Sequence, residues 1–137
     1  MQITRQADYA VRAVLYLAGM DNGGRAATSQ IAREKHIPPS FLAKIVSQLS
    51  VAGVVQTSRG ARGGVSLARS PSNISLLEVV EAIDGPITVN ECVPDAGACI
   101  FGDKCPVHDV WSQVQTGLVD RLAATDFSYL AQQQQAM

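Results

Sequence analysis

A change of hydrophobic period near Gly53 restricts the folds open to this chain. Before it, apolar residues recur at the spacing of one helical face, at Leu42, Ile45, Val46 and Leu49. After it come two short stretches rich in β-branched residues, "VVQTS" (54–58) and "GVSLAR" (64–69), joined by the glycine-rich link "RGARGG" (59–64). These patterns predict a helix that ends at Gly53 and a two-stranded hairpin that follows it.

Two further helices are predicted upstream. Apolar residues at positions 7, 10, 11, 14, 15 and 18 mark one helical face, and "GMDNGG" (19–24) ends that helix. Thr28 is the expected N-cap of a short second helix through Lys35, which Pro38 and Pro39 terminate. Three helices and then a hairpin is the order of a winged helix-turn-helix, which we place in residues 1–70.

Residues 71–137 are expected to hold a helix, a cysteine-bearing loop and a long C-terminal helix. Ser75 and Glu78 form a capping box at the head of the first helix, and Gly85 and Pro86 end it. Pro106 suits the first turn of the long helix, whose apolar positions are Val107, Val110, Trp111, Val114, Leu118 and Leu122. The tail "QQQQAM" (132–137) is expected to fray. The predicted fold class is mainly α with a small β-hairpin.

Charge divides the chain into two halves. Residues 1–69 carry nine Lys and Arg against three Asp and Glu, a balance of +6, whereas residues 70–137 carry two against nine, a balance of −7. Such asymmetry, unless it is chance, indicates a polyanionic partner for the basic half. No segment approaches the roughly 18 consecutive apolar residues that span a bilayer, and no signal peptide is recognised. We therefore expect a cytoplasmic protein that does not bind membranes.

The face of the third helix opposite its apolar stripe suits the major groove of double-stranded DNA. It carries donors, acceptors and one ring, with no acid: Ser40, Phe41, Lys44, Ser47 and Gln48. Lys donates to guanine or phosphate and Gln pairs both ways with adenine, although a plain solvated face is the alternative. Arg59 and Arg62 flank the small tip of the glycine-rich link. This tip could enter a narrow groove of the DNA, or it could be only a hairpin turn. We expect all seven side chains to contact DNA.

The cysteine segment, "ECVPDAGACIFGDKCPVHDV" (91–110), holds all three cysteines in the pattern C-x6-C-x5-C-x2-H, formed by Cys92, Cys99, Cys105 and His108. Cytoplasmic thiols stay reduced, so three cysteines close together in the sequence favour metal or redox chemistry over a disulfide. Three thiolates and a histidine suit structural zinc, and three thiolates with a weaker fourth ligand suit an iron–sulfur cluster. The spacing does not choose between them. The motifs of zinc proteases, serine hydrolases and zinc deaminases are absent, so we expect no enzyme.

Four stretches carry a family resemblance: "DYAVRAVLYLA" (8–18), "IAREKHIPPSFLAKIVSQLSVAGVV" (31–55), "SRGARGGVSLAR" (58–69) and "ISLLEVVEAIDGP" (74–86). With the cysteine segment, they resemble the Rrf2 family of bacterial winged-helix transcriptional regulators, most often repressors. The resemblance implies a homodimer in which the long C-terminal helices pack together and two wings straddle a near-palindromic operator. It also implies that Ser40, Lys44, Gln48 and Arg59 touch the DNA.

The same resemblance implies an iron–sulfur cluster, of the 2Fe–2S or 4Fe–4S type, on the three cysteines, because Rrf2 branches that sense cluster status, nitric oxide or iron bind one there. His108 matches the fourth ligand of one branch. Asp8 matches a carboxylate that another branch takes from its second subunit, although it could simply pair with Arg12 at i+4. A cluster-controlled regulator is therefore expected, and a metal-free thiol switch and a structural zinc site are the alternatives.

Overall fold

A computed structural model describes residues 2–21, 23–60 and 63–137. The main elements, in chain order, are α1 (Arg5–Ala18), α2 (Thr28–Glu34), α3 (Pro39–Val51), β1 (Val55–Ser58), β2 (Gly64–Leu67), α4 (Leu76–Asp84), α5 (Pro106–Ala123) and α6 (Phe127–Gln135). Short 3-10 turns occur at Pro71–Asn73, Ala96–Ala98 and Gly102–Lys104. The predicted fold class, mainly α with one hairpin, is confirmed.

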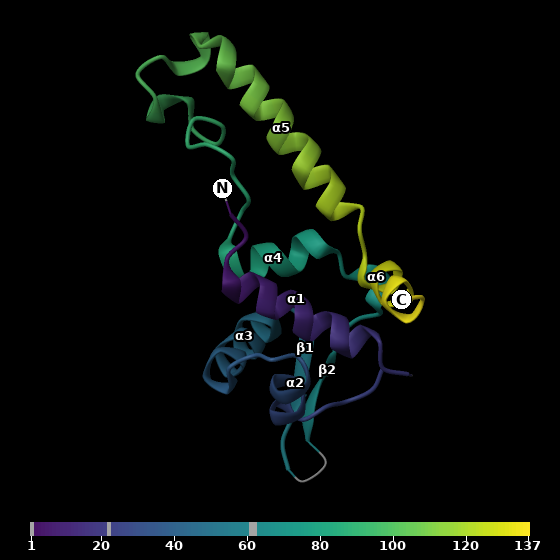
Figure 1. Cartoon of the computed structure of the whole chain (residues 1–137). Coiled ribbons are helices and arrows are strands. Elements are labelled where there is room, and N and C mark those ends of the chain that lie inside the picture. Colours follow the sequence, from purple (N-terminus) through teal and green to yellow (C-terminus); the bar gives the residue numbers. More distant parts are fainter. Residues whose placement is uncertain (1, 22, 61–62) are drawn as a thin grey trace.

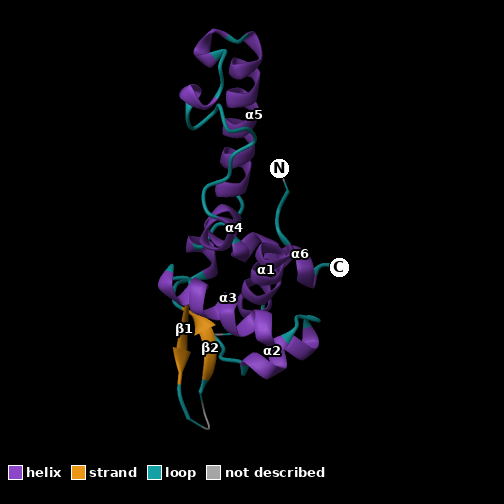
Figure 2. Cartoon of the chain, turned by 90° about the vertical axis from the view of Figure 1, so that its left-hand side faces the viewer, coloured by secondary structure: helices purple, strands orange, loops and turns teal. Residues whose placement is uncertain are grey.

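The molecule consists of a compact body and a projecting arm (Figure 1). The body contains α1 to α4, the hairpin and α6, and the arm, residues 86–123, contains α5 and the segment that leads to it. The backbone N–H of Val89 donates to Oε1 of Gln115 at 3.1 Å, which ties that segment to α5. The cysteine segment lies at the far end of the arm and the hairpin at the opposite end of the molecule in both views (Figure 1 and Figure 2).

The predicted hairpin is an antiparallel pair in which Val55 lies opposite Leu67 and Ser58 opposite Gly64. Ala26 adds a third extended segment, because its N–H and C=O both bond to Val65, at 3.0 and 2.8 Å. A Cβ on Gly64 would lie 2.6 Å from the carbonyl oxygen of Ala26, so this close approach requires glycine. The hairpin is thereby fastened to the residues that precede α2.

Helix α3 has the apolar face expected for it. Leu42, Ile45, Val46 and Leu49 are all buried, and the helix begins at Pro39, where proline needs no intrahelical partner for its nitrogen. Gly53, with φ of +76°, follows the helix end as predicted. The buried face of α1 is wider than its stripe indicated, since it also includes Tyr9, Ala13 and Leu17. The reason is that α1 packs against α3, α4 and α6 at once.

Two expected caps differ from the prediction. Ala27, not Thr28, precedes the first residue of α2, and it forms no side-chain cap, because the extended segment that pairs Ala26 with Val65 ends there. At α4, the Ser75 hydroxyl accepts from the Glu78 N–H at 3.1 Å, which is half of the expected capping box. The other half is absent, because the Glu78 carboxylate instead pairs with Arg69.

The C-terminal residues form α6, which the sequence did not indicate, and residues 132–135 are helical rather than frayed. Asp126 caps this helix by accepting from the N–H of Tyr129 at 2.9 Å. Phe127 is fully buried in the same core as α1, α3 and α4, and its N–H donates to the carbonyl of Ile74 at 3.1 Å. The core therefore continues beyond residue 70. Within the described residues, none of the helices combines the length and the apolar character needed to cross a membrane.

Candidate DNA-binding surface and cysteine segment

The outward face of α3 presents the polar residues that the sequence singled out. Ser40, Lys44 and Ser47 are exposed, and Phe41 is 42% exposed. Gln48 is half-buried, and its Oε1 atom, although buried, has no hydrogen-bond partner among the described residues. This face can therefore donate and accept hydrogen bonds at the surface, with an apolar ring at its N-terminal end.

Side chains of α1 hold the start of α3. The rings of Tyr9 and Phe41 lie 6.1 Å apart in a tilted arrangement, and the Arg12 guanidinium stands 5.2 Å from the Tyr9 ring centre. Arg12 also donates to the carbonyl of Lys35, in the turn before α3, at 3.2 Å. Asp8 pairs with Arg12 at 2.8 Å, as the i+4 alternative predicted. Residues of α1 thus brace the turn before α3 and the first residues of α3 from one side.

Tyr16 holds α2 in the same way, a contact that sequence reasoning missed because its partners lie far along the chain. The Gln30 amide donates to the Tyr16 hydroxyl at 2.9 Å, and Lys35 stands 5.8 Å from the centre of its ring. A hydrogen bond to Glu34, followed by desolvation and the charge of Glu34, raises the pKa of Tyr16 above its usual value. The two helices of the helix-turn-helix are therefore both anchored on α1.

The hairpin supplies the second part of the surface. Arg59 is exposed directly after β1, whereas Arg62 lies outside the described residues. At the base of the hairpin, Arg69 donates to the carbonyls of Gly53 and Asn73, at 3.2 and 2.8 Å, and to both carboxylate oxygens of Glu78. The bond to Glu78 raises the pKa of Arg69. This side chain joins the hairpin, the end of α3 and α4.

The cysteine segment carries three free, half-buried thiols, those of Cys92, Cys99 and Cys105. Cys105 is the N-cap residue of α5, and its carbonyl accepts from the N–H of His108 at 3.1 Å. The Nδ1 atom of His108 is buried without a hydrogen-bond partner in the described part of the chain. Three sulfurs and an unpaired imidazole nitrogen form a donor set of the kind that zinc and iron–sulfur centres use.

The structure does not gather these donors at one point. Within residues 2–21, 23–60 and 63–137, no group of three or more His, Cys, Asp or Glu side chains is placed to hold a metal ion. Asp8 belongs to the body, on α1, while the cysteines lie in the arm (Figure 1). The predicted ligands thus have side chains suited to a metal centre. That these side chains come together at one point stays a prediction.

One side of α5 exposes apolar residues in succession. Val107, Val110, Trp111 and Val114 are 46%, 52%, 38% and 49% exposed. The C-terminal part of the helix packs on the body, where Leu118, Val119 and Leu122 meet a cluster formed by Ala7, Val80 and Ile87. Contiguous exposed apolar side chains of this kind mark an interaction surface.

Comparison with known proteins gives consistent matches over nearly the whole chain. The family model described as Rrf2, iron-dependent transcriptional regulator, matches residues 3–133. The Escherichia coli HTH-type transcriptional regulator IscR is 30% identical over 137 residues, which cover 100% of this chain and 84% of that protein. The matched region includes α3, the hairpin and the cysteine segment.

Solved structures share the fold. CymR, the global cysteine regulator of Bacillus subtilis, is 25% identical with a TM-score of 0.83, and the match covers 96% of this chain and 97% of that one. The oxidized form of Staphylococcus aureus CymR is also 25% identical, with a TM-score of 0.74 and 96% of each chain covered.

Proposed function

Because the chain belongs to the Rrf2 family of transcriptional regulators, we propose that it binds a near-palindromic operator as a homodimer and that its cysteine segment controls this binding. Its role is regulatory rather than enzymatic, as it is for the relatives it matches. In this proposal residues 1–70 read DNA, and residues 71–137 carry the sensor and the dimerisation helix. Repression of transcription is the expected outcome of operator binding.

The exposed polar face of α3 carries the DNA-binding part of the proposal. Ser40, Lys44 and Ser47 are free of acidic neighbours on that face and are held outward by the buried side of the same helix. Such a face suits base edges and phosphates in the major groove. Arg59, exposed on the hairpin, supplies a cation for the adjacent minor groove, and Arg62 follows it in the sequence. Phe41 and Gln48 complete the proposed contact set.

The apolar side of α5 supports a homodimer. Four half-exposed apolar side chains in one stretch gain free energy when they leave water, at about 25 cal/mol per Å² of apolar surface. A second copy of the chain presents the same surface, and a two-fold axis would place the two faces against one another. Such a dimer would carry two reading helices, as a near-palindromic operator requires.

The cysteine segment is the proposed sensor. Cys92, Cys99 and Cys105, with His108 as the fourth ligand, would hold an iron–sulfur cluster of the 2Fe–2S or 4Fe–4S type, and Asp8 of a second subunit is the alternative fourth ligand. The Nδ1 atom of His108, which has no hydrogen-bond partner among the described residues, favours the histidine, whereas the carboxylate of Asp8 is already paired with Arg12. When bound, such a cluster supplies a group that oxygen, nitric oxide or iron shortage can alter or remove.

A sensor without a cluster is the second candidate. Three free thiols, each half-buried and none in a disulfide, can be oxidised directly, and one matched structure is an oxidized form of its protein. Structural zinc is the third reading of the same ligands. The cluster and the direct thiol switch both make the cysteine segment the control element, whereas structural zinc would only stabilise the segment.

Anaerobic purification followed by a visible spectrum and by iron, sulfide and zinc analysis separates these candidates. Absorbance at about 320–460 nm with matching iron and sulfide supports the cluster. A colourless protein with one zinc per chain makes the segment a structural clamp. A colourless, metal-free protein, even after anaerobic reconstitution, excludes the cluster and leaves direct thiol oxidation or a segment without a sensor role.

A further inference from the structure

The joint between α4 and the arm, residues 84–87, has a defined geometry. Helix α4 ends at Asp84, and Gly85 adopts a φ of +77° that L side chains rarely take. Pro86 follows and directs the chain into the segment that reaches Cys92. The direction in which the arm leaves the body is therefore set at this joint.

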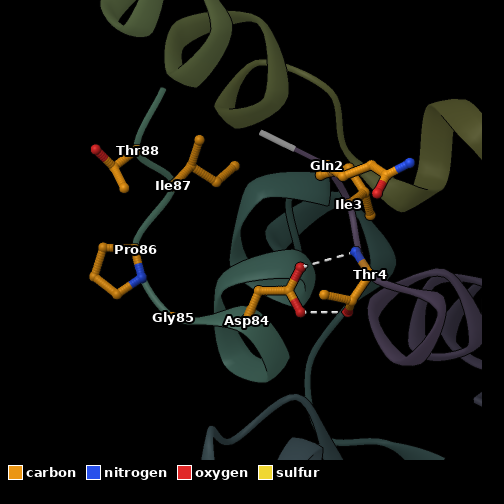
Figure 3. Close-up of a pocket in the computed structure, with 8 residues that line it drawn as sticks. All are labelled: Gln2, Ile3, Thr4, Asp84, Gly85, Pro86, Ile87 and Thr88. Carbon is orange, nitrogen blue, oxygen red and sulfur yellow. Dashed lines mark hydrogen bonds between the residues drawn. The ribbon is translucent and has the colours of Figure 1, made fainter. Parts of the chain in front are cut away.

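Asp84 bonds across the joint to the beginning of α1. The Thr4 N–H donates to Asp84 Oδ2 at 3.3 Å, and the Thr4 hydroxyl donates to Asp84 Oδ1, as Figure 3 shows. The same hydroxyl accepts from the N–H of Ala7 at 3.1 Å and so caps α1. A chain of hydrogen bonds thus runs from the end of α4 into the first turn of α1.

The electrostatics of the two helices favour this bond. A carboxylate is unfavourable at the C-terminus of a helix and favourable at an N-terminus. Asp84 occupies the last turn of its own helix, and the 14-residue helix α1 presents its N-terminus to it. The charge of Asp84 is therefore compensated by α1 and not by α4, and any movement of the joint changes that compensation.

Apolar packing also connects the end of α4 with the first turn of α1. Ile87, the first buried residue of the arm, lies in one cluster with Ala7 of α1 and Val80 of α4, and α5 contributes Leu118 and Leu122. A cavity of about 260 Å³, lined by residues 2–4 and 84–88, lies beside the hydrogen bonds (Figure 3). Because Thr4 and Asp84 are both exposed, they can separate without displacing packed side chains.

We propose that Thr4 and Asp84 form a latch, through which a change in the cysteine segment moves α1 and the reading helix braced on it. Tyr9 and Arg12, further along α1, contact Phe41 and the turn before α3, which completes the connection. Asp84 acts as a positioning residue, because it touches neither the thiols nor the DNA face. The inference rests on the proposed function of the cysteine segment as the sensor.

Hydrogen exchange at the first turn of α1 tests the latch without reference to DNA. The reduced full chain is compared before and after alkylation of its thiols with N-ethylmaleimide, and exchange is followed at the amides of Ala7 and Asp8. Alkylation should speed exchange there about tenfold, the factor expected when one hydrogen bond to a charged group is lost. In Asp84→Ala the exchange is already fast, and alkylation should add nothing.

Two further variants separate the latch from a structural defect. Asp84→Ala replaces an unfavourable helix-end charge with a good helix former, so the fold should persist. Asp21→Ala removes the same charge from the exposed turn after α1, and Thr4→Ser keeps the hydroxyl, so both should respond to alkylation as the natural chain does. An unchanged α1 in the natural chain after alkylation, or an equal response in Asp84→Ala, would overturn the latch.

Operator affinity, measured on the same alkylated and untreated samples, distinguishes this proposal from the proposed function. If alkylation alters exchange in α1 but not DNA affinity, the coupling of the cysteine segment to α1 is supported and the sensor role fails. If alkylation alters DNA affinity equally in the natural chain and in Asp84→Ala, the sensor role stands and the latch fails.

Discussion

Replacement of Phe127 by alanine should destabilise the whole body, because α6 fills part of its core. Phe127 has no exposed surface and packs in one cluster with residues of α1, α3 and α4. Removal of a fully buried phenylalanine costs about 3–5 kcal/mol, which combines lost transfer free energy with the cavity left behind. A domain of this kind is stable by only about 5–15 kcal/mol, so the loss is a large fraction of the total.

Urea denaturation, followed by circular dichroism at a fixed protein concentration, measures this effect. With a slope of about 2 kcal/mol per M, the expected loss lowers the midpoint by about 2 M. Tyr129→Ala is the matched control, because Tyr129 lies on the same helix but is 53% exposed, and it should change stability by no more than about 0.5 kcal/mol. Equal shifts for the two variants would refute the inclusion of α6 in the core.

Three further predictions concern the DNA surface, the dimer and α2. Arg59→Ala should weaken operator binding about tenfold or more and reduce the salt slope by about one, in electrophoretic titrations at several salt concentrations, whereas Arg121→Ala, on the arm, should change neither. Val110→Asp should give monomers in light scattering, while Thr116→Glu, exposed on the opposite side of α5, should stay dimeric. Above about pH 10 the folded state should lose stability relative to Tyr16→Phe, since the raised pKa of Tyr16 stabilises the fold at lower pH and this contribution is lost on deprotonation, as thermal melts would report.

Local patterns predicted the elements whose signals lie in consecutive residues. The apolar repeat in α3, the glycine that follows it and the β-branched stretches of the hairpin all describe their own surroundings, and the structure contains each of them. The exposure of Ser40, Lys44 and Ser47 followed from the same repeat, because the opposite face of a half-buried helix must meet solvent.

Features that depend on distant partners were missed. Helix α6 has only Phe127, Leu130 and Ala131 as apolar contacts, and their partners lie in α1 and near Ile74, more than 50 residues away in sequence. The expected caps at Thr28 and Glu78 failed for a similar reason, because a neighbouring strand or Arg69 competes for the same groups. Spacing alone could not determine whether the cysteines converge, since that depends on the conformation of the loop between them.

The most direct test of the central claim compares operator affinity in two states of one preparation. Anaerobically purified protein is titrated against its operator before and after exposure to oxygen or nitric oxide, alongside Cys99→Ala. The account predicts at least about a tenfold change in affinity, equivalent to about 1.4 kcal/mol, for the natural chain and none for the variant. Equal affinity of the natural chain in all states would contradict control by the cysteine segment.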